Sequence, residues 1–406
     1  MNNTSPRSGP LAHLTVLDIT QFLAGPYGTQ ILGDLGARVI KVEAPEGDIT
    51  RSTPPHFLQG ESAYYLSVNR NKESIVLNLK DKEGQALFLE LVRKADIVYE
   101  NYRPGVLKRL GIDYDTLSKV NPRLVMCSLS GYGQDGPYRD RAAYDIIVQA
   151  LSGGMSMTGE EGGKPVRAGI PLGDLAAGMF GVIAALSGMA HVSATGEGRH
   201  FDVSMLDCQM SMLTYQAAYC LMSGEVPGLQ GRGHRSLTTY RAYLCGDGIE
   251  VVVAANSDKM WRGLCEVLGH PELPGDERFK ERTSRLRYRK DLDQILEAAF
   301  LRVDSAQVLV ALEAAEVPAA PINTVDRALA DPQVAHRDMV IDLTHASGEH
   351  LRVVGNPVKM RGQDAPDNRR FPPHLGADTS QVFQELLGLG SEELAALKAR
   401  GVVAGP

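Results

Sequence analysis

The 406-residue sequence has little of what several common protein classes need. Its five cysteines stand far apart without a CxxC pair, which argues against a disulfide framework and favours a reducing compartment. Basic residues (42) are outnumbered by acidic ones (49), so the chain lacks the basic surface of a general nucleic-acid-binding protein. The N-terminus has no basic stretch leading into an apolar core, and no later apolar run approaches roughly 20 residues. We therefore expect a cytoplasmic protein that neither carries a secretion signal nor crosses a membrane.

Several catalytic motifs are absent as well. The ten histidines are scattered and there is no HExxH pattern, so the sequence predicts no metal site. It also lacks GxSxG, the nucleophile elbow of α/β-hydrolases, and GxxxxGK[ST], the phosphate-binding loop. A formal GxGxxG at 131–136 follows the predicted strand RLVMCSLS. Because Pro137 and polar residues come next, instead of a helix that faces a pyrophosphate, we interpret this segment as a turn. An NAD enzyme stays a minor alternative.

The sequence does contain a regular alternation of short apolar runs with helical stretches. The runs LTVLDI, ARVIKVE, SIVLNL, ADIVYEN and RLVMCSLS are rich in branched residues and predict strands. Between the third and fourth runs, Asp81 can cap a helix with apolar residues at three- and four-residue spacing. This order predicts an α/β fold with a parallel sheet.

The length exceeds what one core usually organises, so we expect two domains. We place the N-terminal part of a large domain at 1–224, a smaller α+β domain at 225–330, and a C-terminal segment at 331–406 that returns to the large domain. The smaller domain should begin with a hairpin that turns at 246–248. Within the large domain, we expect the glycine-rich segment 151–173 to be a loop.

Asp174 stands at the start of the small, apolar helix predicted from Leu175 to about His191. An aspartate in this position is typical of a helix N-cap. The same position also favours an ionised carboxylate, because the positive end of the helix dipole is close, and a carboxylate nucleophile must be ionised. The position alone does not decide between the two interpretations.

Five segments, in order, resemble the family III CoA-transferases, the CaiB/BaiF type that includes formyl-CoA transferase. They are VLDITQFLAGPYGTQILGDLGARVIKVEAPEGDITR, NRNKESIVLNLK, ADIVYENYRPGVLKRLGI, SGYGQDGPYRDRAAYD and VPAAPINTVDRALADPQV, and Asp174 has the family's GDLAAG context. The resemblance implies a Rossmann-like large domain that binds CoA, a smaller α+β domain, and a homodimer of two interlocked chains.

In such enzymes the aspartate, here Asp174, attacks the donor thioester to give a mixed anhydride. The released CoA thiolate then forms an aspartyl-CoA thioester, and the acceptor carboxylate repeats the cycle in reverse. This chemistry needs oxyanion donors and the exclusion of water. We expect Gly153, Gly154 and the GEEGG stretch to supply backbone donors or a covering loop.

The resemblance also implies a set of residues that bind CoA, whose phosphates need cations and backbone amides. The set is Leu23, Ala24, Leu77, Asn78, Leu79, Lys80, Asn101, Tyr102, Arg103, Arg109, Arg141 and Tyr144. One departure is that Ala44 and Glu46 occupy the region where some members place an arginine against the nucleotide. CoA esters are expected as substrates, with no permanently bound cofactor and no metal.

The residue type at position 144 distinguishes two activities found on this fold, CoA transfer and racemisation. Racemases of the same fold use a histidine thirty residues before the aspartate to move the α-proton of an acyl-CoA. Tyrosine, with an ordinary pKa near 10, replaces such a base poorly. We therefore favour CoA transfer, with a 2-methylacyl-CoA racemase and a non-catalytic CoA-ester-binding protein as alternatives.

The substrates are predicted from two further segments. NYRPG and the GRGHRS that precedes Tyr240 most resemble enzymes that use succinyl-CoA and small dicarboxylates such as glutarate, itaconate or malate. The second carboxylate of such an acceptor requires a cation. Arg103, His234 and Arg235 are the candidates.

Overall fold

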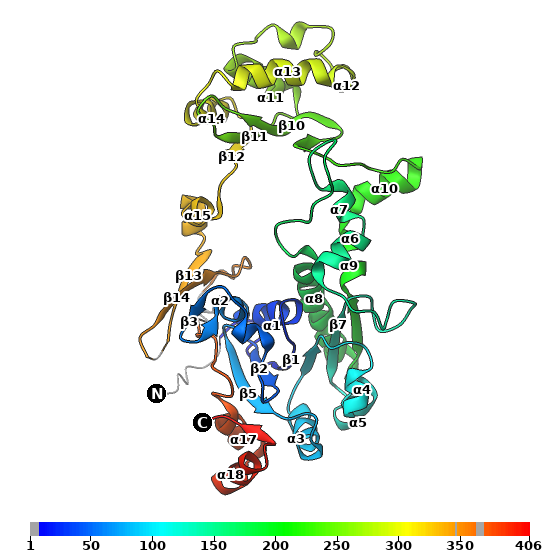
Figure 1. The fold of residues 1–406 in the computed structure, drawn as a ribbon, viewed down its shortest axis with the longest axis vertical. Helices are drawn as coiled ribbons and strands as arrows, with labels where there is room; N and C mark the ends of the chain where they lie inside the picture. Colours follow the sequence, from blue (N-terminus) through cyan, green and yellow to red (C-terminus); the bar gives the residue numbers. More distant parts are fainter. Residues whose placement is uncertain (1–7, 346, 363–368) are drawn as a thin grey trace. The chain divides into compact units, whose positions relative to one another are not determined.

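The structure is a computed structural model that describes residues 8–345, 347–362 and 369–406. The first seven residues, on which the expectation about secretion partly rests, lie outside these ranges. The chain separates into two compact units, which are described here one at a time (Figure 1).

The first unit combines three stretches of the chain: the described residues up to Gly154, then Arg167–Ala217 and Ala335–Pro406. The second unit consists of Met155–Val166 and Ala218–Val334. The predicted glycine-rich loop at 151–173 is thus divided between the units, and it includes the short helix α7 (Gly154–Met157).

A seven-stranded sheet forms the centre of the first unit, in the order β15-β5-β2-β1-β6-β7-β8. Its strands are β1 (Thr15–Ile19), β2 (Arg38–Glu43), β5 (Lys72–Leu77), β6 (Ile97–Glu100), β7 (Val125–Ser130), β8 (His200–Ser204) and β15 (Val403–Ala404). All neighbours run parallel except β15, which is antiparallel to β5. The predicted parallel sheet and its five strands are confirmed, whereas β8 and β15 were not predicted.

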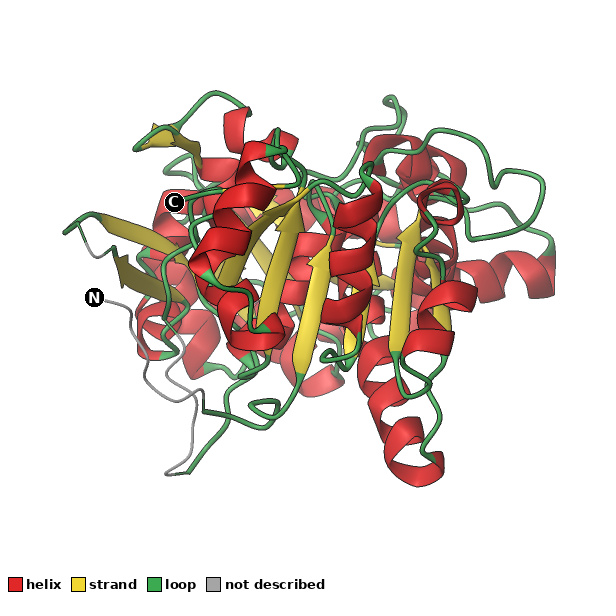
Figure 2. Ribbon diagram, turned by 90° about the horizontal axis from the view of Figure 1, so that it is seen from below, coloured by secondary structure: helices red, strands yellow, loops and turns green. Residues whose placement is uncertain are grey.

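Alternating side chains of these strands enter two separate apolar layers. On β1, Leu17 packs in one layer and Val16 in the other. The first layer also contains side chains of α3 (Lys82–Val92), α17 (Thr379–Leu387) and α18 (Ser391–Ala399). The second contains side chains of α1 (Ala24–Asp34), α6 (Asp145–Leu151), α8 (Leu172–Thr195) and α9 (Met205–Met212). Figure 2 shows the helices lying against both faces of the strands.

Smaller elements complete the first unit. They are η1 (Ile49–Ser52), β3 (Phe57–Leu58), β4 (Glu61–Ser62), α2 (Ala63–Ser67), α4 (Val106–Leu110), α5 (Tyr114–Val120), β13 (Val340–Thr344) and β14 (His350–Val354). Helix α16 (Pro332–His336) crosses the boundary between the units. Strands β13 and β14 pair with each other in antiparallel orientation. Asp81 caps α3 as predicted, because its side chain accepts a hydrogen bond from the Glu83 amide. The segment 131–136 is a turn, as predicted.

The second unit contains a four-stranded antiparallel sheet in the order β12-β11-β10-β9. The elements that complete it are β9 (Gly233–His234), β10 (Leu237–Leu244), β11 (Glu250–Ala254), β12 (Ala319–Pro321), α11 (Asp258–Val267), η2 (Leu273–Gly275), α12 (Arg282–Arg287), α13 (Arg289–Phe300), α14 (Ser305–Ala314) and α15 (Val325–Leu329). The predicted hairpin is confirmed by the pairing of β10 with β11. Helix α10 (Thr214–Ser223) crosses the boundary between the units.

Helix α8 is longer than predicted, with 24 residues and a mean hydropathy of 1.7. The expectation that no segment has the length and apolar composition of a membrane span was therefore wrong. In the first unit, however, α8 packs against α1, α9, β7 and β8. Its alanine and glycine residues let it lie close to neighbouring backbone, as in the core helix of a globular fold.

Helices α1 and α8 meet at glycines. A β-carbon on Gly178 of α8 would lie 2.6 Å from the carbonyl oxygen of Ala24, and one on Gly28 of α1 would lie 2.9 Å from that of Gly178. The buried Tyr99 hydroxyl donates to the same Gly178 carbonyl at 3.1 Å. This crossing therefore leaves no room for larger residues, and it fixes the first turns of α8 beside the start of α1.

We predict that Gly178→Ala separates α1 from α8 and lowers the free energy of unfolding by about 1–3 kcal/mol, because the new methyl group meets backbone that cannot move away cheaply. Chemical denaturation measures this change. The control is Gly275→Ala, where a β-carbon would meet nothing within 4 Å. Equal stability of the two variants would show that the helices do not depend on this contact.

Candidate active site

A cavity of about 680 Å³ opens in the first unit at the carboxyl ends of β1, β6 and β7. From β1 the chain builds the sheet outward through β2 and β5, and it then returns to add β6, β7 and β8 on the other side. The carboxyl ends of β1 and β6 therefore mark the point where strand order reverses. Open α/β sheets bind ligands at this point.

Residues from seven parts of the first unit line the cavity. They are Gln21, Phe22, Ala24, Tyr64, Asn101, Tyr102, Arg103, Pro104, Leu129, Ser130, Gly131, Tyr132, Arg139, Arg141, Ala143, Tyr144, Asp145, Ile146, Arg167, Pro171, Asp174 and Met205. The set combines a carboxylate at the start of α8, aromatic walls and several arginines. None of these lining residues is a histidine or a cysteine.

Asp174 lies in the first turn of α8 and faces this cavity. The N-cap residue of the helix is Pro171, and no side chain caps the helix end, so the prediction that Asp174 is the N-cap was wrong. The first turn is instead tied to α6, because Asp145 Oδ1 accepts a hydrogen bond from the Gly173 amide at 2.7 Å. Asp145 is itself held by Gln149, whose side-chain amide donates to Asp145 Oδ2 at 2.7 Å.

The charge state of Asp174 also differs from the expectation. Burial, and secondly the neighbouring charge of Asp145, raise the pKa of Asp174 to about 7. The helix dipole was expected to keep this carboxylate ionised, but the loss of hydration in the cavity outweighs it. A carboxylate in this state is poised between its acid and its nucleophilic form near neutral pH.

Four tyrosines line the cavity together with this carboxylate: Tyr64, Tyr102, Tyr132 and Tyr144. Burial and the charge of Asp174 raise the pKa of Tyr64 to about 12, so its phenol keeps its proton and can donate. Tyr144, the residue before α6, is largely exposed, and its ring forms a T-shaped contact with the Phe22 ring at 6.4 Å between centroids. The position that a racemase fills with histidine therefore does line the same cavity as Asp174.

Arginines give the cavity its cationic side. A β-carbon on Gly105 would lie 3.5 Å from Arg139 Nη2 and 3.6 Å from Arg109 Nη1, so two guanidinium groups flank the start of α4. The Arg141 guanidinium stacks 3.8 Å above the Tyr138 ring. Among the described residues, no carboxylate forms an ion pair with these three arginines or with Arg103 and Arg167. In an acidic protein, such a group is suited to an anionic ligand.

The structure brings together seven of the residues expected from the sequence. Asp174, Ala24, Asn101, Tyr102, Arg103, Arg141 and Tyr144 all line the cavity. The backbone of Gln21 is fixed next to them, because Asn101 both donates to its carbonyl and accepts from its amide. Their roles in binding CoA stay predictions.

Other expected residues lie elsewhere. The side chains of Leu77 and Leu79 are buried in the core, so only their backbone can face a ligand. Leu23, Asn78, Lys80 and Arg109 are not among the residues that line the cavity. His234 and Arg235 belong to the second unit, where Arg235 pairs with Glu225 and Arg289 donates to both their carbonyl groups.

Several residues that line the cavity were not predicted from the sequence. The main ones are Tyr64, Asp145, Arg139 and Arg167. An arginine in a loop has no periodic pattern that distinguishes it from a solvated surface residue. For Asp145, its place directly after Tyr144 was the available signal, and both residues line the cavity.

Comparison with known proteins agrees with this geometry. The profile of CoA-transferase family III matches residues 11–379. The succinate–glutarate CoA-transferase of Agrobacterium fabrum is 39% identical over 393 residues, which cover 95% of this chain and 98% of that protein. The acetyl-CoA:oxalate CoA-transferase of Acetobacter aceti is 42% identical over 389 residues, with 95% and 98% covered.

A solved structure extends the comparison to the fold. The crystal structure of a CaiB/BaiF family protein from Brucella suis superposes with a TM-score of 0.84 at 36% identity, covering 94% of this chain and all of that one (100%). The chain therefore belongs to CoA-transferase family III. It is an enzyme, and CoA esters are its substrates.

We predict that kcat/KM rises with pH through about 7, the pKa of Asp174, because attack on a thioester needs the ionised carboxylate. Asp145→Asn removes the neighbouring charge, which is the smaller cause of the raised pKa, so it should move the midpoint partway toward lower pH. A pH–rate profile with a CoA ester at low concentration measures both. An unshifted midpoint would mean that Asp145 does not influence the titrating group.

Proposed function

We propose that this enzyme moves CoA from succinyl-CoA to a small dicarboxylate such as glutarate, with Asp174 as the carboxylate that carries the acyl group and then CoA. The observation that carries the proposal is the half-buried Asp174 in a cavity whose lining also includes one phenylalanine, four tyrosines and four arginines, side chains suited to a CoA ester. The names of the relatives in Agrobacterium and Acetobacter support dicarboxylates as acceptors.

The proposed reaction conserves the thioester. The Asp174 carboxylate attacks the donor carbonyl carbon, the carbon–sulfur bond breaks, and CoA leaves as its thiolate. The thiolate then attacks the aspartyl carbonyl of the mixed anhydride, which releases succinate and leaves an aspartyl-CoA thioester. The acceptor carboxylate repeats the two steps in reverse and regenerates the free carboxylate.

The surroundings of Asp174 are suited to these steps. The neutral phenol of Tyr64 can donate a hydrogen bond to an oxyanion, because its pKa of about 12 keeps it protonated. The raised pKa of Asp174 also makes its ionised form more nucleophilic than an ordinary aspartate. The glycine-rich stretch proposed as a covering loop lies largely in the second unit.

A racemase is the second candidate that the fold offers. It requires a base of intermediate pKa to face the α-carbon from the side opposite Asp174. The cavity residues that the structure describes include no histidine, and Tyr144 occupies the corresponding position. Transfer is therefore the better explanation.

The second carboxylate of the acceptor needs a cation that shares the cavity with Asp174. We assign this role to Arg167, which precedes Asp174 by seven residues and lies in the segment that leads into α8. The following residue is fixed to α6, since Gln149 Oε1 accepts from the Ala168 amide at 2.9 Å. The remaining arginines then stay available for the phosphates of CoA, while His234 and Arg235 remain candidates from the second unit.

We also propose a homodimer of interlocked chains in the cytoplasm, in which the first unit is the large CoA-binding domain and the second the small domain. Exposed apolar side chains on α8, namely Met179, Phe180 and Ile183, support a partner surface. All five cysteines are free and four are buried, which is consistent with a reducing compartment.

We predict that Asp174→Asn lowers turnover more than about a thousandfold, because the amide cannot form the anhydride. Steady-state transfer of CoA from succinyl-CoA to glutarate measures this loss. The binding of succinyl-CoA should persist, and this control separates lost chemistry from lost folding. Ordinary turnover in the variant would refute the assignment of Asp174.

Arg167→Gln should raise the KM for glutarate about tenfold, because it removes about one charge-assisted hydrogen bond to the second carboxylate. Butyrate lacks this carboxylate, so its KM should stay within about twofold. The contrast between the two acceptors is the measurement, with succinyl-CoA as the donor throughout. As a comparison, Arg139→Gln should raise the KM for succinyl-CoA whichever acceptor is used. If Arg167→Gln affects both acceptors equally, Arg167 does not select dicarboxylates.

A further inference from the structure

A network of four buried charges lies beneath the cavity in the first unit. The side chains of Lys41, Lys72, Asp18 and Asp48 are all at most 1% exposed. Lys41 Nζ lies 3.0 Å from Asp48 Oδ2, and Lys72 Nζ lies 3.0 Å from Asp18 Oδ2. The two positive and two negative charges thus offset one another in a site that is shielded from solvent. Burial of a charged group is costly unless the group has an oppositely charged partner and hydrogen bonds.

The pKa values agree with this pairing. Burial alone raises the pKa of Asp18, but the charges of Lys72 and Lys41 outweigh it and lower the value to about 2. Burial also raises the pKa of Asp48, and Lys41 lowers it below its ordinary value. Both carboxylates are therefore ionised at neutral pH, as the ion pairs require.

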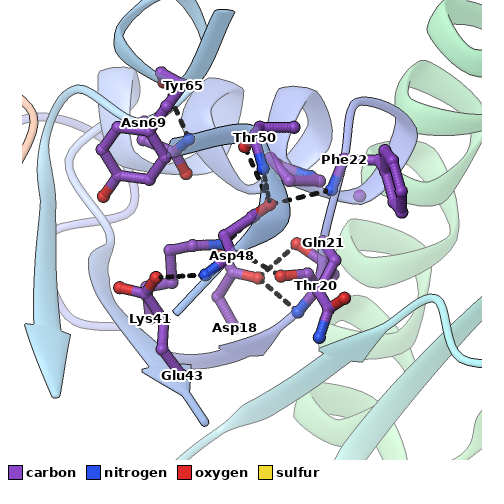
Figure 3. A network of polar contacts seen from close by, with 12 residues as sticks. Asp18, Thr20, Gln21, Phe22, Lys41, Glu43, Asp48, Thr50, Tyr65 and Asn69 are labelled. Carbon is purple, nitrogen blue, oxygen red and sulfur yellow. Dashed lines mark hydrogen bonds and ion pairs between the residues drawn. The ribbon is translucent and has the colours of Figure 1, made fainter. Parts of the chain in front are cut away.

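The network forms hydrogen bonds to the short segment Thr20–Phe22, which joins β1 to α1. Lys41 Nζ donates to the Thr20 carbonyl at 2.8 Å, and Asp18 Oδ1 accepts from the Thr20 amide at 2.9 Å. Asp48 Oδ1 accepts from the Phe22 amide in a longer contact of 3.5 Å. Figure 3 shows these contacts converging on the segment, with the Phe22 ring turned away from the charges.

One residue of this segment, Phe22, has an unusual backbone conformation. Phe22 has a φ of 65°, a left-handed value that a bulky residue rarely adopts. Residues in such conformations persist only where their surroundings hold them, at a cost of about 1–3 kcal/mol. As a result the ring of Phe22, 42% exposed, lies on the cavity wall and packs against the Tyr144 ring in a T-shaped arrangement.

We propose that Lys41 and Asp48 are positioning residues for CoA transfer, because they hold Phe22 against Tyr144 and so shape the wall of the cavity beside Asp174. Neither of the two residues lines the cavity, so they act through the segment that they bind. The consequence for the reaction rests on the proposed function, in which the thioester carbon must meet Asp174 in a defined geometry. Displacement of the wall should therefore slow the chemical step and leave the binding of the nucleotide end unchanged.

The test compares two substitutions that each remove one charge from a buried ion pair. Asp48→Asn removes the carboxylate that is paired with Lys41 at 3.0 Å, whereas Asp34→Asn removes the carboxylate that is paired with Arg70 at 2.6 Å. Asp34 and Arg70 do not line the cavity. Asp48→Asn should lower kcat about tenfold and leave the KM for succinyl-CoA within about twofold of the wild-type value. Asp34→Asn should leave kcat within about twofold of the wild-type value. Equal kcat losses in the two variants would show a general effect of stability and overturn the proposal.

A double-mutant cycle tests whether the effect passes through Phe22. Glycine adopts a φ of 65° without strain, so Phe22→Gly keeps the backbone path while it removes the ring. Asp48→Asn should then cause less than about a twofold change in kcat in the Phe22→Gly background, since effects that share one route are not additive. Additive losses overturn the proposal.

A measurement without turnover separates this proposal from the proposed function. In a Phe22→Trp variant, acrylamide quenching reports the exposure of the new indole, and the single native tryptophan, Trp261, is only 1% exposed. Adding Asp48→Asn should at least double the quenching constant, and adding Asp34→Asn should not change it. An unchanged constant after Asp48→Asn overturns the positioning role. If the wild-type enzyme transfers no CoA, the proposed function fails, but the quenching result still decides whether the network holds position 22.

Discussion

Helices α1 and α8 cross so closely that each has a glycine where the backbones approach. Gly178 lies against the Ala24 carbonyl, and Gly28 lies against the Gly178 carbonyl. Asp174 stands one helical turn before Gly178, so this crossing places its carboxylate next to the segment that joins β1 to α1. The remaining parts of the site follow from the sheet, since Asn101, Tyr102 and Arg103 come directly after β6. Backbone packing in the core thus determines where the chemistry occurs.

The buried carboxylates of the first unit show how their surroundings separate structural from reactive roles. Asp18 is surrounded by lysines and hydroxyl groups, and its pKa falls to about 2. Asp174 has no ion pair among the described residues, and burial with Asp145 nearby raises its pKa to about 7. The same side chain is therefore a fixed anion in one place and a titratable carboxylate, the proposed nucleophile, in the other. The fixed anion also supports the segment that forms part of the cavity wall beside Asp174.

The sequence predicted the elements whose signal is local. The strands β1, β2, β5, β6 and β7 were recognisable because both their faces are buried, and they read as continuous apolar runs. By contrast, β8 (HFDVS) is short and half exposed, and the two-residue β15 joins the sheet only through tertiary contact with β5. The start of α8 was misplaced by three residues, because its end is stabilised by Asp145 of another helix and not by a cap in its own sequence.

The site was predictable to the extent that it follows strand ends and family motifs. Leu77 and Leu79 show the limit of that approach, since a motif marks a position but not the direction of its side chain. Arg139 and Arg167 carry no pattern at all, and the raised pKa of Asp174 depends on burial that a sequence does not reveal. The cap assignment failed for the same reason.

The role proposed for Asp174, to carry the acyl group and then CoA, can be tested by covalent trapping. Enzyme incubated with succinyl-CoA is treated with hydroxylamine, and its peptides are analysed by mass spectrometry. We expect a hydroxamate on the peptide that contains Asp174 and no label on the corresponding peptide of Asp174→Asn. CoA transfer without any label at Asp174, or with label on another carboxylate, would refute this role.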